Sequence, residues 1–436
     1  MNYERKSYRG ETLMLLSRVQ NAAINLVTRA IIQLEPVVAF ARQWPGTALA
    51  VLLGLHLIVW TAIPIIMGHS LPLDAVEGLA LGKEWQLGYW KHPPLAWWLD
   101  DLAYRVSGTN TSVYLLGPLS TVTCMYVVWR YAREVIEPIG ALIAALSLES
   151  IHFFNYSAVQ FNQNVVQLPF WVLASWYFYR AVIDARFRDW LLAGIFLALA
   201  FWSKYSALAL AGTLSLVLLG DPLARKSCRT PGPYLMALAF LIVLYPNLKW
   251  LLDNGFLPFH YAVERAVAAA HWYDYLWFPL RWSFSQLYYL VPMLILLAVS
   301  FWGTRLRDTP TDFARRYVMA LAVGPFVLTT VTAMVSGRLP IPMWGYSLWT
   351  FLPLAVVMWY KPMDNKIQLL RFFAAFILLF VAAPTAFILA DRIEPLFRDR
   401  PKASQYPSAP SHSNRGYNLF SLTRASAVVN CQSALA

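Results

Sequence analysis

The stretch WLLAGIFLALAFWSKYSALALAGTLSLVLL, residues 190–219, decides how the chain is organised. A helix that crosses a bilayer needs about 20 mostly apolar residues, so this run is too long for one span. It is interrupted by Ser-Lys-Tyr at 203–205, and a charge inside an apolar helix is costly. We therefore predict two short helices that meet at Lys204.

The composition outside this run is that of a membrane protein. Hydrophobic residues make up 58% of the chain and charged residues 13%, whereas soluble proteins average about 25% charged residues. Cys124, Cys228 and Cys431 lie far apart, so no disulfide framework or zinc ribbon follows from them. The net charge of +12 fits basic cytoplasmic loops better than a nucleic-acid partner.

Nine further apolar segments are long enough to cross a membrane. They lie near residues 48–68, 113–130, 138–154, 164–182, 233–251, 284–303, 317–336, 341–359 and 371–390. Together with the two helices that meet at Lys204, they predict an all-α integral membrane protein with about 11 transmembrane helices.

The distribution of Lys and Arg predicts the orientation of these spans. With the N-terminus inside, the cytoplasmic segments hold 21 of these residues, the opposite side holds 8, and the tail holds 6. We expect residues 1–47 to be a cytoplasmic amphipathic leader, 48–390 the transmembrane catalytic domain, and 391–436 a poorly ordered extracytoplasmic tail. Without the break at Lys204, every later loop would change sides.

Two outer loops, the first (69–112) and the fourth (252–283), are long and rich in aromatic residues, which favour the membrane interface. We expect short interfacial helices in both. Seven charges gather at residues 71–101 of the first loop. Asp74 and Glu77 follow Pro72 and share one face of a helix. Their spacing alone also fits a solvated interfacial helix.

This segment resembles the first outer loop of the bacterial PMT-type glycosyltransferases (family 39/83-like) of the GT-C superfamily. These enzymes use polyprenyl-phosphate sugars. The resemblance rests on Asp74, on His92-Pro93-Pro94-Leu95 about eighteen residues later, and on three further stretches. Those stretches are FFNYSAVQFNQNVVQLPFW (153–171), ALAFWSKYSAL (198–208) and GRLPIPMWGYSLWTFLPL (337–354).

The resemblance implies a transferase that moves a sugar from a polyprenyl phosphate to an extracytoplasmic acceptor, more readily a lipid or glycolipid, such as lipopolysaccharide, than a protein. Asp74, with Glu77 as the less well matched acid, would supply the carboxylate that acts as base. The leaving phosphate needs cations and donors. The candidates are Lys91, His92, Lys204 with its neighbour Tyr205, Arg265, Arg281 and Arg338.

Several readings remain open. Lys204 could bind phosphate or only extend to the interface. His92 could bind substrate or only begin a turn. Asn162 and Asn164 could contact sugar hydroxyls or cap a helix. The chain departs from the family at Ala75, where many relatives have Glu, and at Lys91, where many have an acid.

Because Lys91 replaces that acid, the sequence does not support a divalent metal there, and we predict no cofactor. A transporter or flippase for a lipid-linked sugar is the rival reading. Such proteins usually show internal repeats, and none is evident in this sequence. An inactive scaffold is a third reading.

Overall fold

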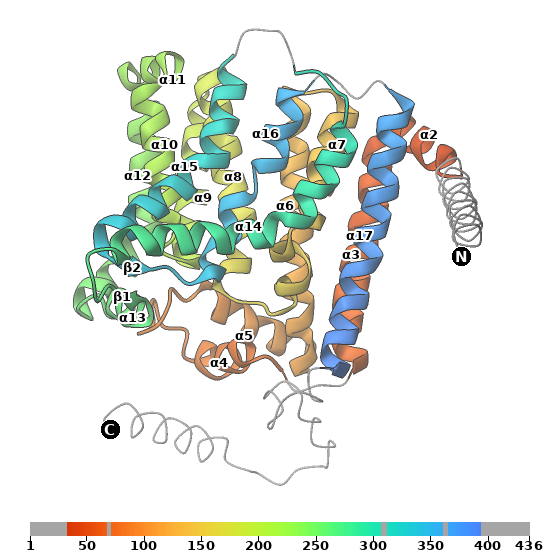
Figure 1. Cartoon of the computed structure of the whole chain (residues 1–436). Coiled ribbons are helices and arrows are strands. Elements are labelled where there is room, and N and C mark those ends of the chain that lie inside the picture. Colours follow the sequence, from red (N-terminus) through yellow and green to blue (C-terminus); the bar gives the residue numbers. More distant parts are fainter. Residues whose placement is uncertain (1–32, 68–70, 307–311, 361–364, 394–436) are drawn as a thin grey trace, which may run out of the picture.

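We describe the protein from a computed structural model over residues 33–67, 71–306, 312–360 and 365–393 (Figure 1). This part is almost entirely helical. Its α-helices are α2 (Glu35–Gln43), α3 (Pro45–Met67), α4 (Leu73–Leu81), α5 (Leu95–Ser107), α6 (Val113–Val135), α7 (Pro138–Ser147), α8 (Gln163–Asp184), α9 (Phe187–Ser203), α10 (Ala207–Gly220), α11 (Pro222–Lys226), α12 (Gly232–Asp253), α13 (Leu257–Arg265), α14 (Asp274–Phe301), α15 (Phe313–Ser336), α16 (Leu352–Trp359) and α17 (Lys366–Ile393).

Short elements join these helices. The 3-10 helices are η1 (Gly82–Glu84), η2 (Asn110–Ser112), η3 (Leu148–Ser150), η4 (His152–Phe154), η5 (Tyr156–Val159), η6 (Ser227–Arg229) and η7 (Pro342–Trp349). Two strands, β1 (Val267–Ala268) and β2 (Arg338–Leu339), pair antiparallel, with Val267 opposite Leu339. This pair ties the segment after α13 to the segment after α15.

The helices confirm an all-α membrane protein, but they do not confirm eleven spans. In the described residues, six helices are long and apolar enough to cross a membrane, or eight if two bent pairs each count as one span. The six are α3, α6 with η2, α12, α14, α15 and α17. Helix α9 is shorter than these, and the predicted span 341–359 consists of η7 followed by α16. The predicted leader lies mostly, and the predicted tail almost entirely, outside the described residues.

The predicted span 138–154 is bent rather than straight. Its axis turns by 87° between the segment Pro138–Ser150 and the segment His152–Val159. A buried polar cluster lies at the bend, where His56 Nδ1 is 2.5 Å from Glu149 Oε2 and His56 Nε2 is 2.9 Å from Thr121 Oγ1. These contacts tie α3 and α6 to η3, so the bend is fixed by residues far away in the sequence.

Helix α8 lies in the core and packs against α9 and α6, while α9 packs against α12. Trp171 of α8 is fully buried. The backbones of α9 and α12 approach closely at Gly194, where an added Cβ would lie 2.3 Å from the carbonyl oxygen of Met236. Small residues allow such close packing between membrane helices. This core carries the residues around Lys204.

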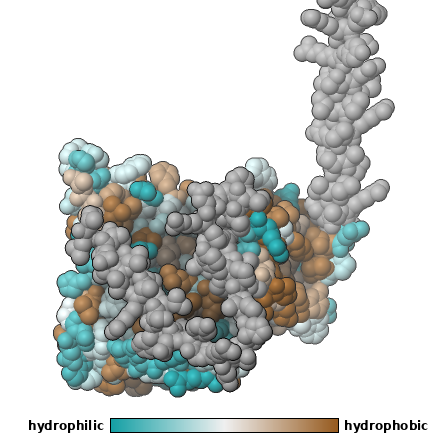
Figure 2. All heavy atoms as spheres, turned by 90° about the horizontal axis from the view of Figure 1, so that it is seen from below, coloured by the Kyte–Doolittle hydropathy of each residue, from teal (hydrophilic) through white to brown (hydrophobic). Residues whose placement is uncertain are grey.

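The short helices α4, α5 and α13 and the β1–β2 pair gather at one end of the bundle, the lower end in Figure 1, which we call the loop end. Helix α11 lies at the opposite end. Figure 2 looks onto the loop end and shows hydrophilic residues along its rim beside hydrophobic ones. Helices are therefore present in both long predicted outer loops. Their place in the membrane interface stays a prediction.

Candidate active site

The break predicted at Lys204 is confirmed. Helix α9 ends at Ser203, α10 begins at Ala207, and Lys204 has an extended backbone between them. The broken backbone is held by the buried side chain of Gln167 from α8. Its Nε2 donates to the carbonyl oxygens of Ala200 (3.0 Å) and Lys204 (2.7 Å). Its Oε1 accepts from the hydroxyls of Ser206 (3.1 Å) and Ser347 (2.8 Å). Gln167 is thus a structural clamp, with each polar atom of its side chain used twice.

The ammonium group of Lys204 is held in a defined position. Lys204 is 9% exposed, and its Nζ donates to Oδ1 of Asn164. The same Nζ lies 5.6 Å from the centre of the Trp344 ring, within range of a cation–π interaction. Lys204 therefore does not extend freely toward solvent. Asn164 contacts it directly, while Asn162 caps α8 by accepting from the backbone N–H of Asn164 at 2.9 Å.

The two carboxylates of α4 have different surroundings. Glu77 accepts from Lys91 Nζ at 2.7 Å, so these two candidates neutralise each other at a half-exposed position. The charge of Asp74 instead acts on Lys204, on Asp100 of α5 and on Tyr346 of η7. Asp74 therefore belongs to a cluster that also contains Lys204, and Glu77 to a separate ion pair.

His92 lies beside this cluster. Burial, and then the positive charges of Lys204 and Lys91, lower the pKa of His92 well below its usual 6.5. The imidazole is therefore neutral near pH 7 and offers one N–H donor and one acceptor. Its ring packs edge-on against Tyr261 of α13, with centroids 5.8 Å apart. His92 can thus donate a hydrogen bond to an anion, but it does not bring a charge.

The remaining candidates have structural contacts or lie elsewhere. The hydroxyl of Tyr205 donates to Asn247 Oδ1 at 3.0 Å, and Asn247 Nδ2 donates to the carbonyl oxygen of Leu87 at 2.7 Å. Arg338 Nη1 donates to the carbonyl oxygens of Val263 and Ala266, which holds the end of α13. Arg265 and Arg281 are exposed. Within the described residues, no hydrogen bond or ion pair joins these arginines to Asp74.

Sequence reasoning missed several residues of this cluster. Trp344 and Tyr346 lie in a predicted span, where aromatic residues give no distinct signal. Asp100 belongs to the charged segment already noted, eight residues after His92, yet nothing in its spacing separated it from Asp101. In the part of the chain that the structure describes, no group of three His, Cys, Asp or Glu side chains is placed to hold a metal ion.

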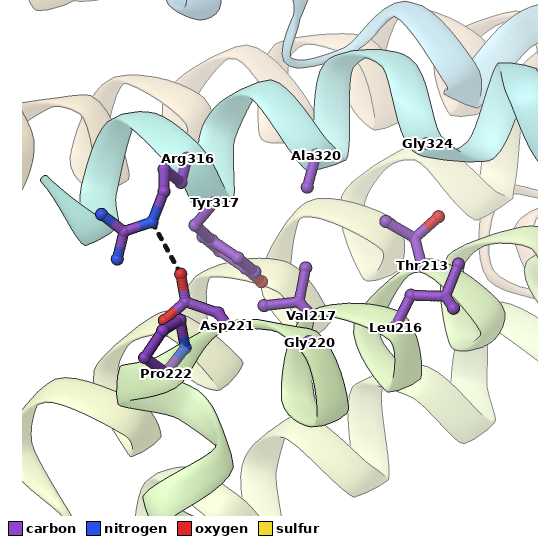
Figure 3. Close-up of a pocket in the computed structure, with 10 residues that line it drawn as sticks. All are labelled: Thr213, Leu216, Val217, Gly220, Asp221, Pro222, Arg316, Tyr317, Ala320 and Gly324. Carbon is purple, nitrogen blue, oxygen red and sulfur yellow. Dashed lines mark hydrogen bonds and ion pairs between the residues drawn. The ribbon is translucent and has the colours of Figure 1, made fainter. Parts of the chain in front are cut away.

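A pocket of about 390 Å³ lies away from this cluster, between α10 and α15 (Figure 3). It is lined mainly by apolar side chains, and an ion pair of 2.7 Å between Arg316 Nε and Asp221 Oδ2 closes one end. Asp221 follows the last residue of α10, whereas Lys204 precedes the first. The lining of the pocket begins at Thr213, six residues after the first residue of α10, so about 9 Å of helix separates the pocket from the start of α10 beside the Lys204 break.

Comparisons with known proteins match large parts of this chain in sequence and in fold. Residues 91–250 match the family described as dolichyl-phosphate-mannose-protein mannosyltransferase. The chain is 24% identical to the lipid A galacturonosyltransferase RgtD of Rhizobium johnstonii over 299 aligned residues. This alignment covers 67% of the chain and 61% of RgtD. The chain thus spans about three fifths of the length of this relative.

The fold is similar to that of ArnT from Cupriavidus metallidurans. The crystal structure of ArnT bound to undecaprenyl phosphate superposes with a TM-score of 0.54 at 15% sequence identity, over 80% of this chain and 65% of ArnT. The apo structure of ArnT gives a TM-score of 0.52 with the same coverage. In its sequence over residues 91–250 and in its fold, the chain is confirmed to resemble the bacterial PMT-type GT-C glycosyltransferases.

Proposed function

We propose that this protein is a multi-pass glycosyltransferase of the bacterial inner membrane. It moves a sugar from a polyprenyl phosphate to a lipid or glycolipid acceptor, such as lipopolysaccharide, on the extracytoplasmic side. The observation that carries the proposal is the Asp74–Lys204 cluster. It combines a carboxylate on a half-exposed helix with a buried cation held at a helix break, beside the neutral His92.

The reaction needs a base for the acceptor. Asp74 takes the proton of the acceptor hydroxyl while the acceptor oxygen forms a bond to the anomeric carbon of the donor sugar. The bond from this carbon to the phosphate oxygen breaks, and its electron pair leaves with the phosphate. A single displacement of this kind inverts the anomeric centre. The carboxylate also stabilises positive charge that develops on the sugar ring.

The leaving polyprenyl phosphate needs positive charge and hydrogen-bond donors. Burial lowers the pKa of Lys204 to about 7, and the negative charges of Asp74 and of a bound phosphate favour its protonated form. Protonated Lys204 supplies the cation, and Asn164 and Trp344 hold its ammonium in place. His92 supplies an uncharged N–H. Lys91 is paired with Glu77, so it contributes less net charge to this group.

The comparisons support the classes of donor and acceptor. RgtD is named as a lipid A galacturonosyltransferase, and the ArnT crystal contains undecaprenyl phosphate. A transferase for lipid A or a related glycolipid agrees with both. The sugar itself is the finer choice, and we propose to test galacturonate first because RgtD carries that name.

The deciding experiment uses purified protein in nanodiscs with undecaprenyl-phosphate galacturonate and lipid A, and mass spectrometry of the acceptor. Addition of one sugar that requires the protein supports the proposal. A transporter or flippase would bind the donor but leave the acceptor mass unchanged. If a panel of undecaprenyl-phosphate sugars gives no product, mass spectrometry of the envelope glycolipids from a deletion strain decides between the proposal and its refutation. An unchanged envelope would refute the proposal.

A further inference from the structure

Two adjacent aspartates of α5 differ sharply in their contacts. Asp100 and Asp101 are both 1% exposed. Asp101 Oδ2 accepts from Trp85 Nε1 at 2.7 Å and from Arg105 Nε at 2.5 Å. Neither carboxyl oxygen of Asp100 has a hydrogen-bond partner among the described residues. Buried carboxylates are normally paired or hydrogen-bonded, so the lack of a partner at Asp100 needs an explanation.

Asp100 lies against the backbone of the helix that carries Asp74. A Cβ added at Gly78 of α4 would be 1.9 Å from Asp100 Oδ2, so the carboxyl occupies the space above that glycine. Gly78 follows Asp74 by four residues and lies on the same face of α4. The two carboxyl groups are therefore neighbours on either side of the α4–α5 contact.

The two groups cannot both be ionised without a large repulsion. Asp74 is partly exposed to solvent, whereas Asp100 is buried. Burial, and then the negative charge of Asp74, raise the pKa of Asp100 well above its usual 3.8. Burial and the neighbouring charge therefore favour the protonated form of Asp100.

The elements packed against α5 provide the charges that affect the protonation of Asp100. They are α4, η1, η2, α6, α8 and α9. Helix α4 provides Asp74 and Glu77, η1 provides Lys83 and Glu84, and Lys204 follows α9. On its own helix the charged neighbours of Asp100 are Asp101 and Arg105, which bind each other, and Lys91 and His92 precede that helix. Helices α6 and α8 carry their charged residues near their C-terminal ends, and η2 has none.

We propose that Asp100 is a positioning residue that holds a proton beside Asp74, so that this pair has one negative charge when the anionic donor binds. This inference rests on the proposed function. If Asp100 loses the proton, a second negative charge faces the donor phosphate and weakens donor binding. A neighbouring like charge changes an ionisation equilibrium by about ten-fold or more. We expect a loss of similar size in the affinity for the anionic donor.

Infrared spectroscopy of the full chain in nanodiscs tests the proton directly. The difference between the wild type and Asp100→Asn should contain the carbonyl band of a protonated carboxyl at pH 7. Asp74→Asn should move the disappearance of this band to lower pH, because it removes the neighbouring charge. Asp101→Asn is the matched control and should leave the band in place. A wild type without the band, or a band indifferent to Asp74→Asn, would overturn the proposal.

Binding of undecaprenyl phosphate tests the consequence. The Kd for undecaprenyl phosphate is measured over the pH range in which the infrared band disappears. It should rise about ten-fold in the wild type but not in Asp100→Asn. The ionisation of the ligand itself cancels in the ratio of the two proteins. Equal pH dependence in both would overturn the inference. If the wild type shows the infrared band and the pH-dependent binding but transfers no sugar, only the proposed function is refuted. If it transfers sugar but lacks the band, only the role of Asp100 is refuted.

Discussion

Replacing Lys204 with Met removes the cation while keeping the length and apolar stem of the side chain. In the structure the ammonium donates to Asn164 and lies 5.6 Å from the Trp344 ring centre. The whole residue is 9% exposed, so water competes weakly for these contacts. A hydrogen bond to a charged group contributes about 1.5–3 kcal/mol. Loss of such a bond to the donor phosphate corresponds to a donor Kd higher by about 10- to 150-fold.

The assay is the apparent affinity for the polyprenyl-phosphate sugar at a fixed acceptor concentration. Lys204→Arg should keep part of the affinity, because guanidinium also pairs with phosphate, though with another geometry. Lys249→Met is a suitable control, since Lys249 is exposed and paired with Asp253 on α12. Equal donor affinities in the wild type, Lys204→Met and Lys204→Arg would refute the phosphate role. The Met variant would then be neutral or slightly more stable, because a charge leaves an apolar setting.

Three further predictions test the site and its frame. Asp74→Asn should lower turnover by about 10²–10⁴-fold in a steady-state assay with folding unchanged, and activity above a tenth of the wild type would exclude Asp74 as the base. Gln167→Leu removes four hydrogen bonds that clamp the Lys204 break and should lower the free energy of unfolding by about 2–4 kcal/mol, measured by denaturant titration in detergent; no change would mean that the break holds without the clamp. Cysteines placed at Asp74, Glu77, Lys91 and His92 should react with a membrane-impermeant thiol reagent in intact spheroplasts, and labelling that needs lysis would reverse the predicted topology.

Sequence reasoning succeeded where the cause was local. The apolar run at 190–219 and the cost of Lys204 within it predicted the helix break at the correct residue. Asp74 and Glu77 were expected on one helix after Pro72, and α4 begins at Leu73. Asn162 was open between a cap and a sugar contact, and the structure shows the cap. In each case the deciding atoms lie within a few residues of one another.

The rest depended on partners that the sequence does not reveal. The bend after Glu149 is held by His56, which is 93 residues away. Gln167 lies in the first turns of α8, and one of its partners is Ser347, 180 residues later. Asp100 and Asp101 look equivalent in the sequence, yet only Asp101 faces Trp85 and Arg105. The direction in which a side chain points within a folded core decides such roles.

The clamp at the helix break also has a consequence for the order of synthesis. Gln167 and Lys204 leave the ribosome early, whereas Ser347 follows Gln167 by 180 residues and Trp344 belongs to the same late segment. At about 5–20 residues per second, the nascent chain spends roughly 9–36 s with Gln167 missing one bond. Trp344 follows Lys204 by 140 residues, so Lys204 lacks its aromatic cover for roughly 7–28 s. Chaperones and proteases in cells act on chains of low stability. A ribosome that stalls before η7 should therefore yield an inserted but short-lived chain, whereas one that stalls after η7 should yield a stable one.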